Sequence, residues 1–280
     1  MENKLNLHSI LKSTFIVAGI ILLLSASLKQ KQKEEIRNDF REFFEANHAD
    51  GSFVLYNQNE DSYVYYNKPL TTQMYSPAST FKICNSLIGL ETGVIKDADF
   101  VIPWDSIERS YNVWNQDTDL KSAFKNSTVW YYQELARRVG KDKMNYWLIK
   151  STYGNADTTG GIDQFWLTGG LRVSPKQQIQ FLRSLRNNTL PFSERSMDIV
   201  KDIMVAKDTL DYVVRAKTGW GSTPTQYIGW YVGYVEKDGN VYYFSTCMLT
   251  RGLDDTYIRN ARKEITYLIL NKLNIISVSP

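Results

Sequence analysis

The sequence predicts a mixed α/β (α+β) fold, in which one antiparallel β-sheet carries the terminal helices and a mostly helical lobe is inserted between its strands. Three observations support this prediction. Strand-like runs occur near both ends of the chain, amphipathic helical patterns lie outside them, and residues from about 79 to 205 are mostly helical in pattern. A cleft between sheet and lobe is where a small-molecule site is expected.

Two β-hairpins are expected, one near each end of the chain. Residues 52–56 and 62–66 are rich in aromatic and β-branched side chains and flank a polar segment. Residues 227–235 and 241–249 flank a segment that contains an Asp-Gly pair, which is typical of tight hairpin turns. These four runs supply strands of the predicted sheet.

Apolar periodicity predicts two terminal helices. Residues 34–47 are expected to form the first and residues 256–273 the second. The apolar positions expected to face the sheet are Ile36, Phe40, Phe43, Phe44, Ile258, Ala261, Ile265, Leu268 and Leu273.

Residues 1–26 have the pattern of a secretory signal peptide. Lys4 and Lys12 precede the apolar run 15–24, and small residues follow at 25–27. A bilayer span needs about 20 apolar residues, and this run is shorter. Cleavage near residue 26 and export of the remaining chain are therefore expected, without a stable membrane partner, and an uncleaved anchor is the alternative.

The composition argues against several classes of function. Without residues 1–26 the chain holds 31 basic and 29 acidic side chains, a balance that does not indicate nucleic-acid binding. His8 and His48 are the only histidines, which leaves almost no candidate for a His-based catalytic triad and none for a His-bound metal site. Cys84 and Cys247 are too few for a disulfide framework, and are either one bridge or two buried thiols.

The first chemical motif is Ser79-Thr-Phe-Lys82, at the expected start of a helix. Residues three apart share one helix face, so the Lys82 amine can reach the Ser79 hydroxyl. A hydroxyl needs an adjacent base to become a good nucleophile, and the N–H groups of a helix start favour negative charge there. Ser-x-x-Lys also begins at Ser9 and at Ser122, so the motif alone is compatible with a helix cap and a solvated lysine.

Two further elements follow in chain order. Ser127-Thr-Val129 offers a second hydroxyl, and Lys217-Thr-Gly219 would present an ammonium and a hydroxyl at a strand edge. The glycine would let a substrate approach the backbone. Tyr153-Gly-Asn155 lies between these elements, and a simple turn is its alternative interpretation.

The motifs Ser-x-x-Lys, Ser-x-x and Lys-Thr-Gly, in this order, resemble the penicillin-recognising serine enzymes. Ser-Thr-Val together with Tyr-Gly-Asn is similar to the class D, oxacillinase-type β-lactamases. The resemblance is carried by residues 76–94, 165–169, 217–220 and 228–233, and it covers roughly Phe40 to the C-terminus. Cys84 departs from the family, in which a proline is usual at this position.

The resemblance implies the β-lactamase/transpeptidase-like fold and an exported enzyme, periplasmic or secreted, whose catalytic domain is residues 27–280. Ser79 would form an acyl-enzyme with a small-molecule β-lactam, and Lys82, carboxylated by CO₂ or bicarbonate, would be the general base. Ser127 would pass a proton to the departing nitrogen, and Lys217 would keep the local field positive. The backbone N–H groups of Ser79 and Trp220 would form the oxyanion hole.

Two sets of side chains would support this chemistry. The substrate-binding set is Val129, Thr218, Gly219 and Arg259, with a solvated helix arginine as the alternative for Arg259. The set that would support the carboxylated lysine is Phe81, Trp166 and Leu167, for which core packing is the alternative. At an ordinary pKa of about 10.4 roughly 1 lysine in 2,500 is neutral at pH 7, so burial must lower the Lys82 pKa before CO₂ can bind. The Trp166 indole N–H could donate to the carbamate. No metal or other cofactor is expected.

Two other functions share these motifs. Penicillin-sensing domains of membrane receptors acylate without turnover, but normally end a longer chain with several membrane spans. A cell-wall D,D-transpeptidase also forms an acyl-enzyme, and Ser-Thr-Val in place of a Ser-x-Asn element argues against it. The rate of deacylation distinguishes the three. The substrate range and the oligomeric state stay open.

Overall fold

The structure, a computed structural model, describes residues 32–277 except residue 224 and residues 251–254. The expected signal peptide lies outside the described residues. From residue 34 onward the described residues belong to one compact unit. Within the described part of the chain, no helix is both long enough and apolar enough to cross a membrane.

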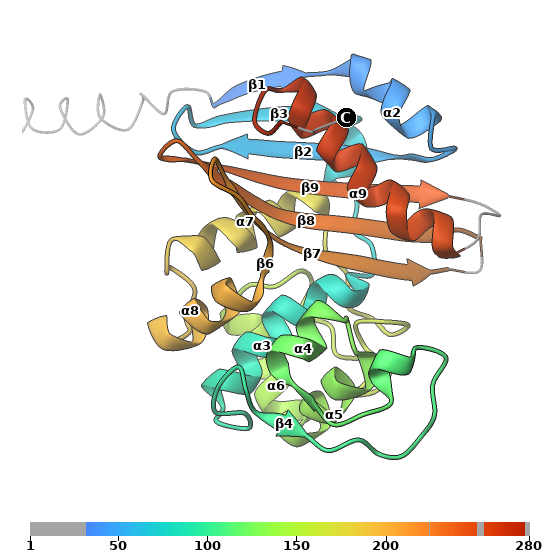
Figure 1. Cartoon of the computed structure of the whole chain (residues 1–280), viewed down its shortest axis with the longest axis vertical. Helices are drawn as coiled ribbons and strands as arrows, with labels where there is room; N and C mark the ends of the chain where they lie inside the picture. Colours follow the sequence, from blue (N-terminus) through green and yellow to red (C-terminus); the bar gives the residue numbers. More distant parts are fainter. Residues whose placement is uncertain (1–31, 224, 251–254, 278–280) are drawn as a thin grey trace, which may run out of the picture. The chain divides into compact units, whose positions relative to one another are not determined.

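A seven-stranded sheet forms the centre of the described unit (Figure 1). Its strands are β1 (Lys33–Ile36), β2 (Asp50–Asn57), β3 (Ser62–Tyr66), β6 (Val205–Asp208), β7 (Val213–Ser222), β8 (Tyr227–Lys237) and β9 (Asn240–Thr250). The order is β1-β3-β2-β9-β8-β7-β6, and the pairings from β3 across to β6 are antiparallel. Because β2 pairs with β9, strands from the two ends of the chain are neighbours.

Both predicted hairpins are confirmed. β2 and β3 pair with Leu55 opposite Val64, and β8 and β9 pair with Val235 opposite Tyr242. The second turn places Asp238 and Gly239 at φ values of 49° and 70°. A type I′ turn requires this left-handed conformation at both central residues, which is why Asp-Gly predicts it.

The prediction of a helix over residues 34–47 is wrong in its first part. Residues 33–36 form β1, followed by the 3₁₀ helix η1 (Asn38–Phe40) and α2 (Arg41–Glu45). Ile36 is 49% exposed, whereas Phe40 and Phe44 are fully buried. The sheet edge overrides the helical pattern, because pairing beside β3 satisfies backbone groups that a helix would otherwise pair internally; Arg37 N donates to Tyr65 O at 2.7 Å.

The predicted closing helix is confirmed as α9 (Asp255–Lys272), which with α2 covers one face of the sheet (Figure 1). Ala261 and Ile265 are buried as expected. Leu268 is only half-buried, and Ile269 and Leu270 are buried instead, because a 3.6-residue period moves the apolar stripe around the helix. The Ile258 side chain lies outside the described residues.

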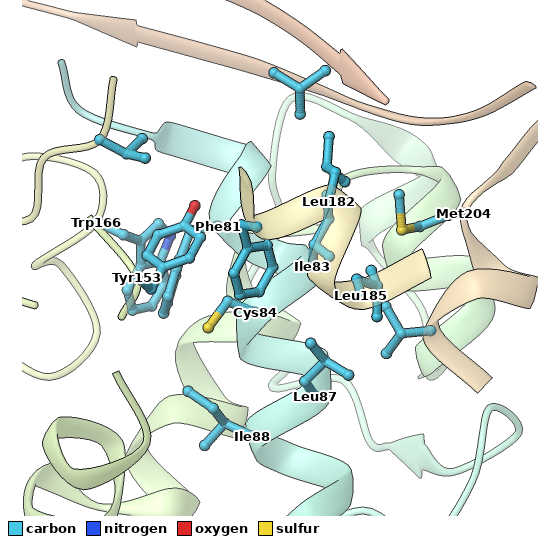
Figure 2. Close-up of a cluster of buried hydrophobic side chains, with 14 of the residues drawn as sticks. Phe81, Ile83, Cys84, Leu87, Ile88, Tyr153, Trp166, Leu182, Leu185 and Met204 are labelled. Carbon is cyan, nitrogen blue, oxygen red and sulfur yellow. The ribbon is translucent and has the colours of Figure 1, made fainter. Parts of the chain in front are cut away.

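The inserted lobe is mostly helical, as predicted. Its elements are the 3₁₀ helices η2 (Lys68–Thr72), η3 (Ala78–Phe81) and η4 (Asn112–Trp114), the helices α3 (Lys82–Glu91), α4 (Leu120–Lys125), α5 (Val129–Val139), α6 (Lys141–Lys150), α7 (Pro175–Arg186) and α8 (Glu194–Ile203), and the short paired strands β4 (Val101–Ile102) and β5 (Thr118–Asp119). α3 is buried along almost its whole length (Figure 2), and α7 packs against strands β2, β8 and β9 of the sheet. The first turn of α3 is thereby held on a rigid core.

Candidate active site

The Ser-x-x-Lys motif spans the junction between η3 and α3. Ser79 lies in η3, and Lys82 is the first residue of α3. Lys82 Nζ donates to Ser79 Oγ at 2.7 Å. Lys82 is fully buried, whereas Ser79 keeps 9% of its surface exposed. The hydroxyl can therefore meet a ligand while the amine behind it is shielded from water.

Lys82 lies in a strongly apolar environment. Its Nζ is 5.2 Å from the centroid of the Tyr132 ring, and burial lowers the pKa of Lys82 to about 7. At that pKa about half of the molecules hold a neutral amine at pH 7, against roughly 1 in 2,500 for an unperturbed lysine. A neutral amine can accept a proton or react with an electrophile, which an ammonium cannot do.

A second lysine–serine pair joins the lobe to the sheet. Lys217, on β7, donates from Nζ to Ser127 Oγ at 3.1 Å and to the Thr218 carbonyl at 3.1 Å. Burial lowers the pKa of Lys217 well below its ordinary value, and the charges of Lys82 and Arg262 lower it further. Ser127 has φ 55°, a left-handed conformation that costs about 1–2 kcal/mol for a residue with a Cβ.

The glycine of Lys-Thr-Gly lets β7 lie close to residues 77–80, the turn that holds Ser79. A Cβ added at Gly219 would come within 3.0 Å of the Pro77 carbonyl oxygen and of Thr80 Cγ2. The neighbouring strand β8 also binds this segment, because Trp230 Nε1 donates to the Ser76 carbonyl at 2.9 Å. A side chain at position 219 would push the sheet away from Ser79.

A pocket of about 530 Å³ opens above these groups. The predicted residues that line it are Ser79, Ser127, Val129, Leu167, Thr218, Trp220 and Arg259. The other predicted residues, Phe81, Lys82, Trp166, Lys217 and Gly219, are not among the lining residues. The structure thus places seven of the predicted residues on the pocket surface, and the other five lie behind that surface.

Trp166 is one of the residues behind the pocket surface. It is fully buried, and its ring centroid is 5.3 Å from that of Phe81 (Figure 2). Its indole Nε1 is buried and finds no hydrogen-bond acceptor among the described residues. A buried N–H without an acceptor costs about 1–3 kcal/mol, so this atom marks a position where an acceptor would be stabilised.

Known proteins resemble this chain over most of its length. Residues 44–271 match the family described as the penicillin binding protein transpeptidase domain. The chain is 40% identical over 266 residues to the β-lactamase OXA-48 of Klebsiella pneumoniae, covering 95% of this chain and 98% of that protein. The crystal structure of the class D β-lactamase YbXI from Nostoc is 42% identical with a TM-score of 0.81, covering 86% of this chain and all of that one.

The chain belongs to the class D β-lactamases. The family resemblance stated from the motifs is thereby confirmed, as is the fold class. The C-terminal domain of the BlaR penicillin receptor of Bacillus licheniformis is also similar in structure, with 33% identity, a TM-score of 0.83, and coverage of 88% of this chain and 98% of that one.

Sequence reasoning missed one basic residue of the class D pocket. Arg262 lines it beside Arg259, is 7% exposed, and donates to the Gly219 carbonyl. It follows Arg259 by three positions on α9, so helical spacing could have indicated that both share a face. The Arg259 guanidinium lies 4.8 Å from the centroid of the Tyr111 ring.

The other missed residues of this class D pocket belong to no catalytic motif, although Thr168 lies in the block 165–169 that carries the family resemblance. They are Tyr111, Val113, Trp114, Asn126, Gln164, Thr168, Gly221 and Ser222. Tyr111, Val113 and Trp114 come from a loop of the lobe without a motif, and only tertiary contacts bring that loop to the pocket.

The remaining sequence candidates have structural roles within the class D fold. Ser122 lies in the first turn of α4, where its N and Oγ donate to the N-cap residue Asp119. Tyr153 is buried against Phe81, at 5.5 Å between ring centroids, and Asn155 donates to the Gly170 carbonyl within a turn. Ser9 lies outside the described residues.

Both cysteines of this class D chain are buried free thiols. Of the two alternatives left open by the sequence, the bridge is therefore wrong. Cys84 lies in α3 and Cys247 in the middle of β9.

Proposed function

We propose that this protein hydrolyses the β-lactam ring of penicillin-type antibiotics through an acyl-enzyme on Ser79, and thereby gives antibiotic resistance. The observation that carries the proposal is the 2.7 Å hydrogen bond from Lys82 to Ser79 Oγ beside a pocket that also holds Ser127. OXA-48, which matches nearly the whole chain, is named a β-lactamase.

Acylation follows from this geometry. Lys82 takes the Ser79 proton as the Oγ attacks the lactam carbonyl carbon, and the backbone N–H groups of Ser79 and Trp220 stabilise the oxyanion. As the carbonyl–nitrogen bond breaks, Ser127 passes a proton to the nitrogen and takes up the proton that the base removed from Ser79, so that both the Ser127 hydroxyl and the base are restored. The hydrogen bond from Lys217 orients the Ser127 hydroxyl. Burial lowers the pKa of Lys217, so its proposed role of keeping the local field positive requires that it hold its proton when substrate is bound.

The base role is proposed for Lys82 carboxylated by CO₂. Two observations fit: burial lowers the pKa of Lys82 to about 7, so that a large share of the amine is neutral near neutral pH, and the buried Trp166 N–H needs an acceptor. The modification supplies a carboxylate-like base that can activate water for deacylation. Phe81 and Trp166 exclude bulk water on one side, while Val129 and Leu167 line the pocket on the other.

The substrate carboxylate is assigned to the basic end of the pocket. Arg259 and Arg262 both line it, with the Thr218 hydroxyl on the adjoining strand. A guanidinium can bind a carboxylate through two parallel hydrogen bonds, so this end recognises the acid group common to β-lactam antibiotics.

We also propose that residues 1–26 are a signal peptide, and that residues 27–280 act in the periplasm or outside the cell. The pattern of basic, apolar and small residues supports this. Intact-mass measurement of protein from a bacterial host would give a mature chain that starts near residue 27. A chain that retains residue 1 in the exported fraction would support the anchor instead.

The test of the proposed function is the rate of deacylation. Wild-type protein mixed with excess penicillin should turn over many equivalents, with the acyl adduct seen by mass spectrometry only transiently. The similarity to the BlaR receptor domain makes the other outcome informative. A stoichiometric adduct that persists for hours would make this chain a sensor or a transpeptidase.

Ser127→Ala and Arg259→Ala are expected to differ in their kinetic signatures. Loss of the Arg259 guanidinium removes a charge-assisted hydrogen bond, and should weaken apparent substrate binding by about 1.5–3 kcal/mol. Loss of the Ser127 hydroxyl should slow acylation, because the leaving nitrogen then lacks its proton donor. Stopped-flow kinetics separate the two effects, and an identical signature for both variants would contradict this division of roles.

A further inference from the structure

The loop of residues 103–117 forms one wall of the pocket, and we call it the wall loop. It leaves and re-enters the lobe through the short antiparallel pair of β4 and β5. Tyr111, Val113 and Trp114, near its end, line the pocket, and the Tyr111 ring lies against the Arg259 guanidinium of α9. The apolar faces that a substrate side chain would meet therefore depend on how the wall loop is held.

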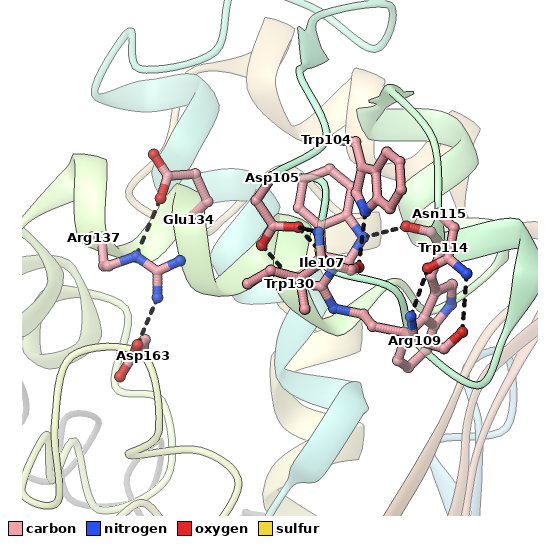
Figure 3. Close-up of polar contacts among 10 residues, drawn as sticks. All are labelled: Trp104, Asp105, Ile107, Arg109, Trp114, Asn115, Trp130, Glu134, Arg137 and Asp163. Atoms are coloured by element: carbon pink, nitrogen blue, oxygen red, sulfur yellow. Dashed lines mark hydrogen bonds and ion pairs between the residues drawn. The ribbon is translucent and has the colours of Figure 1, made fainter.

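Arg109 joins the two halves of the wall loop (Figure 3). Its guanidinium donates to both carboxylate oxygens of Asp105, at 2.8 and 2.6 Å. Its backbone N donates to Asn115 Oδ1 at 2.8 Å, and Asn115 Nδ2 donates back to the Arg109 carbonyl at 2.9 Å. The bond from Arg109 lowers the pKa of Asp105, so this carboxylate stays ionised at mildly acidic pH.

Two tryptophans connect the wall loop to the residue before Ser127. Trp130 Nε1, from α5, donates to the Trp114 carbonyl at 2.8 Å. Trp114 Nε1 in turn donates to the Asn126 carbonyl at 3.1 Å. That carbonyl belongs to the peptide unit whose nitrogen is Ser127 N. The side chain that lines the pocket thus also holds the backbone at the left-handed Ser127.

The Arg109 side chain lies against this connection. Its guanidinium carbon is 5.5 Å from the centroid of the Trp130 ring, and Arg109 Nη1 also donates to the Ile107 carbonyl at 2.8 Å. Arg109 itself is not among the residues that line the pocket. Any effect of Arg109 on the reaction must therefore pass through the residues that it contacts, which are those of the wall loop and Trp130 of α5.

We propose that Arg109 is a positioning residue of the active site. Its side chain binds Asp105 and its backbone binds Asn115. These bonds fix the position of Trp114, which lines the pocket and holds the peptide before Ser127. The inference rests on the proposed function and adds a specificity to it. Substrates with an aromatic or other bulky apolar side chain would pack that side chain against Val113 and Trp114, whereas the bare bicyclic nucleus has no such side chain to place there. Removing Arg109 should therefore penalise the first class more.

The experiment compares two substrates in Arg109→Ala and in a matched control. For a penicillin with an aromatic side chain, KM should rise about tenfold, as expected for the loss of one charge-assisted contact, while KM for 6-aminopenicillanic acid should change less than about twofold. The acylation rate constant should fall for both, because Ser127 is shared. Arg138→Ala is the control, since Arg138 makes a similar ion pair with Glu134 at 2.8 Å on α5 and does not line the pocket.

A double-mutant cycle tests whether Arg109 acts through Trp114. Trp114→Phe keeps an aromatic ring and removes the N–H that Asn126 accepts. If the connection is as proposed, Arg109→Ala should add much less to KM in the Trp114→Phe background than in the wild type. Fully additive effects would overturn the proposal. So would an Arg109→Ala protein with wild-type kinetics on both substrates, or an equal loss on both with no change in acylation.

Folding and the proposed function are controlled separately. Thermal unfolding of each variant shows whether the lobe is intact. If Arg109→Ala does not fold, Asn115→Ala is the second variant. It removes the side chain that accepts from the Arg109 backbone N and donates to the Arg109 carbonyl. It must then raise KM for the aromatic penicillin more than KM for 6-aminopenicillanic acid. Wild-type protein that fails to turn over either substrate would contradict the proposed function, whereas active wild type with unchanged Arg109 and Asn115 variants contradicts only this inference.

Discussion

Replacing Ser79 by alanine is expected to abolish both turnover and covalent labelling by penicillin. The Ser79 Oγ is the oxygen that Lys82 Nζ contacts at 2.7 Å, and the pocket opens onto it. Removing the nucleophile of a catalytic unit typically costs about 10⁴–10⁶-fold in turnover. Intact-mass spectrometry after incubation with penicillin should show no adduct on the variant and one on the wild type.

Ser122→Ala is the matched control for this prediction. Ser122 belongs to the same Ser-x-x-Lys pattern, but its hydroxyl is bonded to Asp119 at the start of α4. Its loss removes one side-chain hydrogen bond to the cap residue, which should cost about 1 kcal/mol, and should leave turnover and labelling largely intact. A penicillin adduct on the Ser79→Ala protein, or loss of labelling in Ser122→Ala, would move the nucleophile away from Ser79.

Activity is expected to fall as pH drops below about 7 and to recover partly when bicarbonate is added. Burial lowers the pKa of Lys82 to about 7, so above that pH the amine is largely neutral and can bind CO₂. Below it, each pH unit reduces the neutral fraction about tenfold, and the carboxylated form is lost. The pKa of Lys82 is shifted downward because the apolar environment disfavours the charged ammonium form.

Trp166 variants sharpen this prediction. Trp166→Ala removes both an indole donor and part of the apolar wall, so it should slow deacylation more than acylation and make turnover more dependent on bicarbonate. Trp166→Phe keeps an aromatic ring beside Phe81 and removes only the donor. Its deacylation rate and bicarbonate dependence should lie between those of the wild type and of Trp166→Ala. The measurements are penicillin turnover across pH with and without bicarbonate, and ¹³C-bicarbonate NMR of the resting protein.

Absence of a carbamate signal, together with turnover that does not depend on bicarbonate, would contradict the carboxylated lysine. The general base would then be the free Lys82 amine, which the lowered pKa also permits. A trapped acyl-enzyme in Trp166→Ala would support the proposal, because it separates the step that forms the adduct from the step that needs an activated water.

Local patterns predicted the hairpins, the closing helix and the helical lobe correctly, because each depends on contacts between residues near in sequence. The error at residues 34–37 has the opposite cause. Ile36 fits a helical period, yet the free edge of β3 offers its backbone a strand partner. Edge pairing depends on a strand about 30 residues away, and no local period contains that information.

The sequence by itself determined the family and the order of the chemical groups, because Ser79 and Lys82 need only one helical turn to meet and Lys217-Thr-Gly needs only a strand. The tertiary structure decided the rest. It alone placed Lys217 beside Ser127, buried Lys82 enough to lower its pKa, and left the Trp166 N–H without an acceptor among the described residues. It also brought Arg262 and the wall loop to the pocket, since packing between distant segments sets burial and the partners of each side chain.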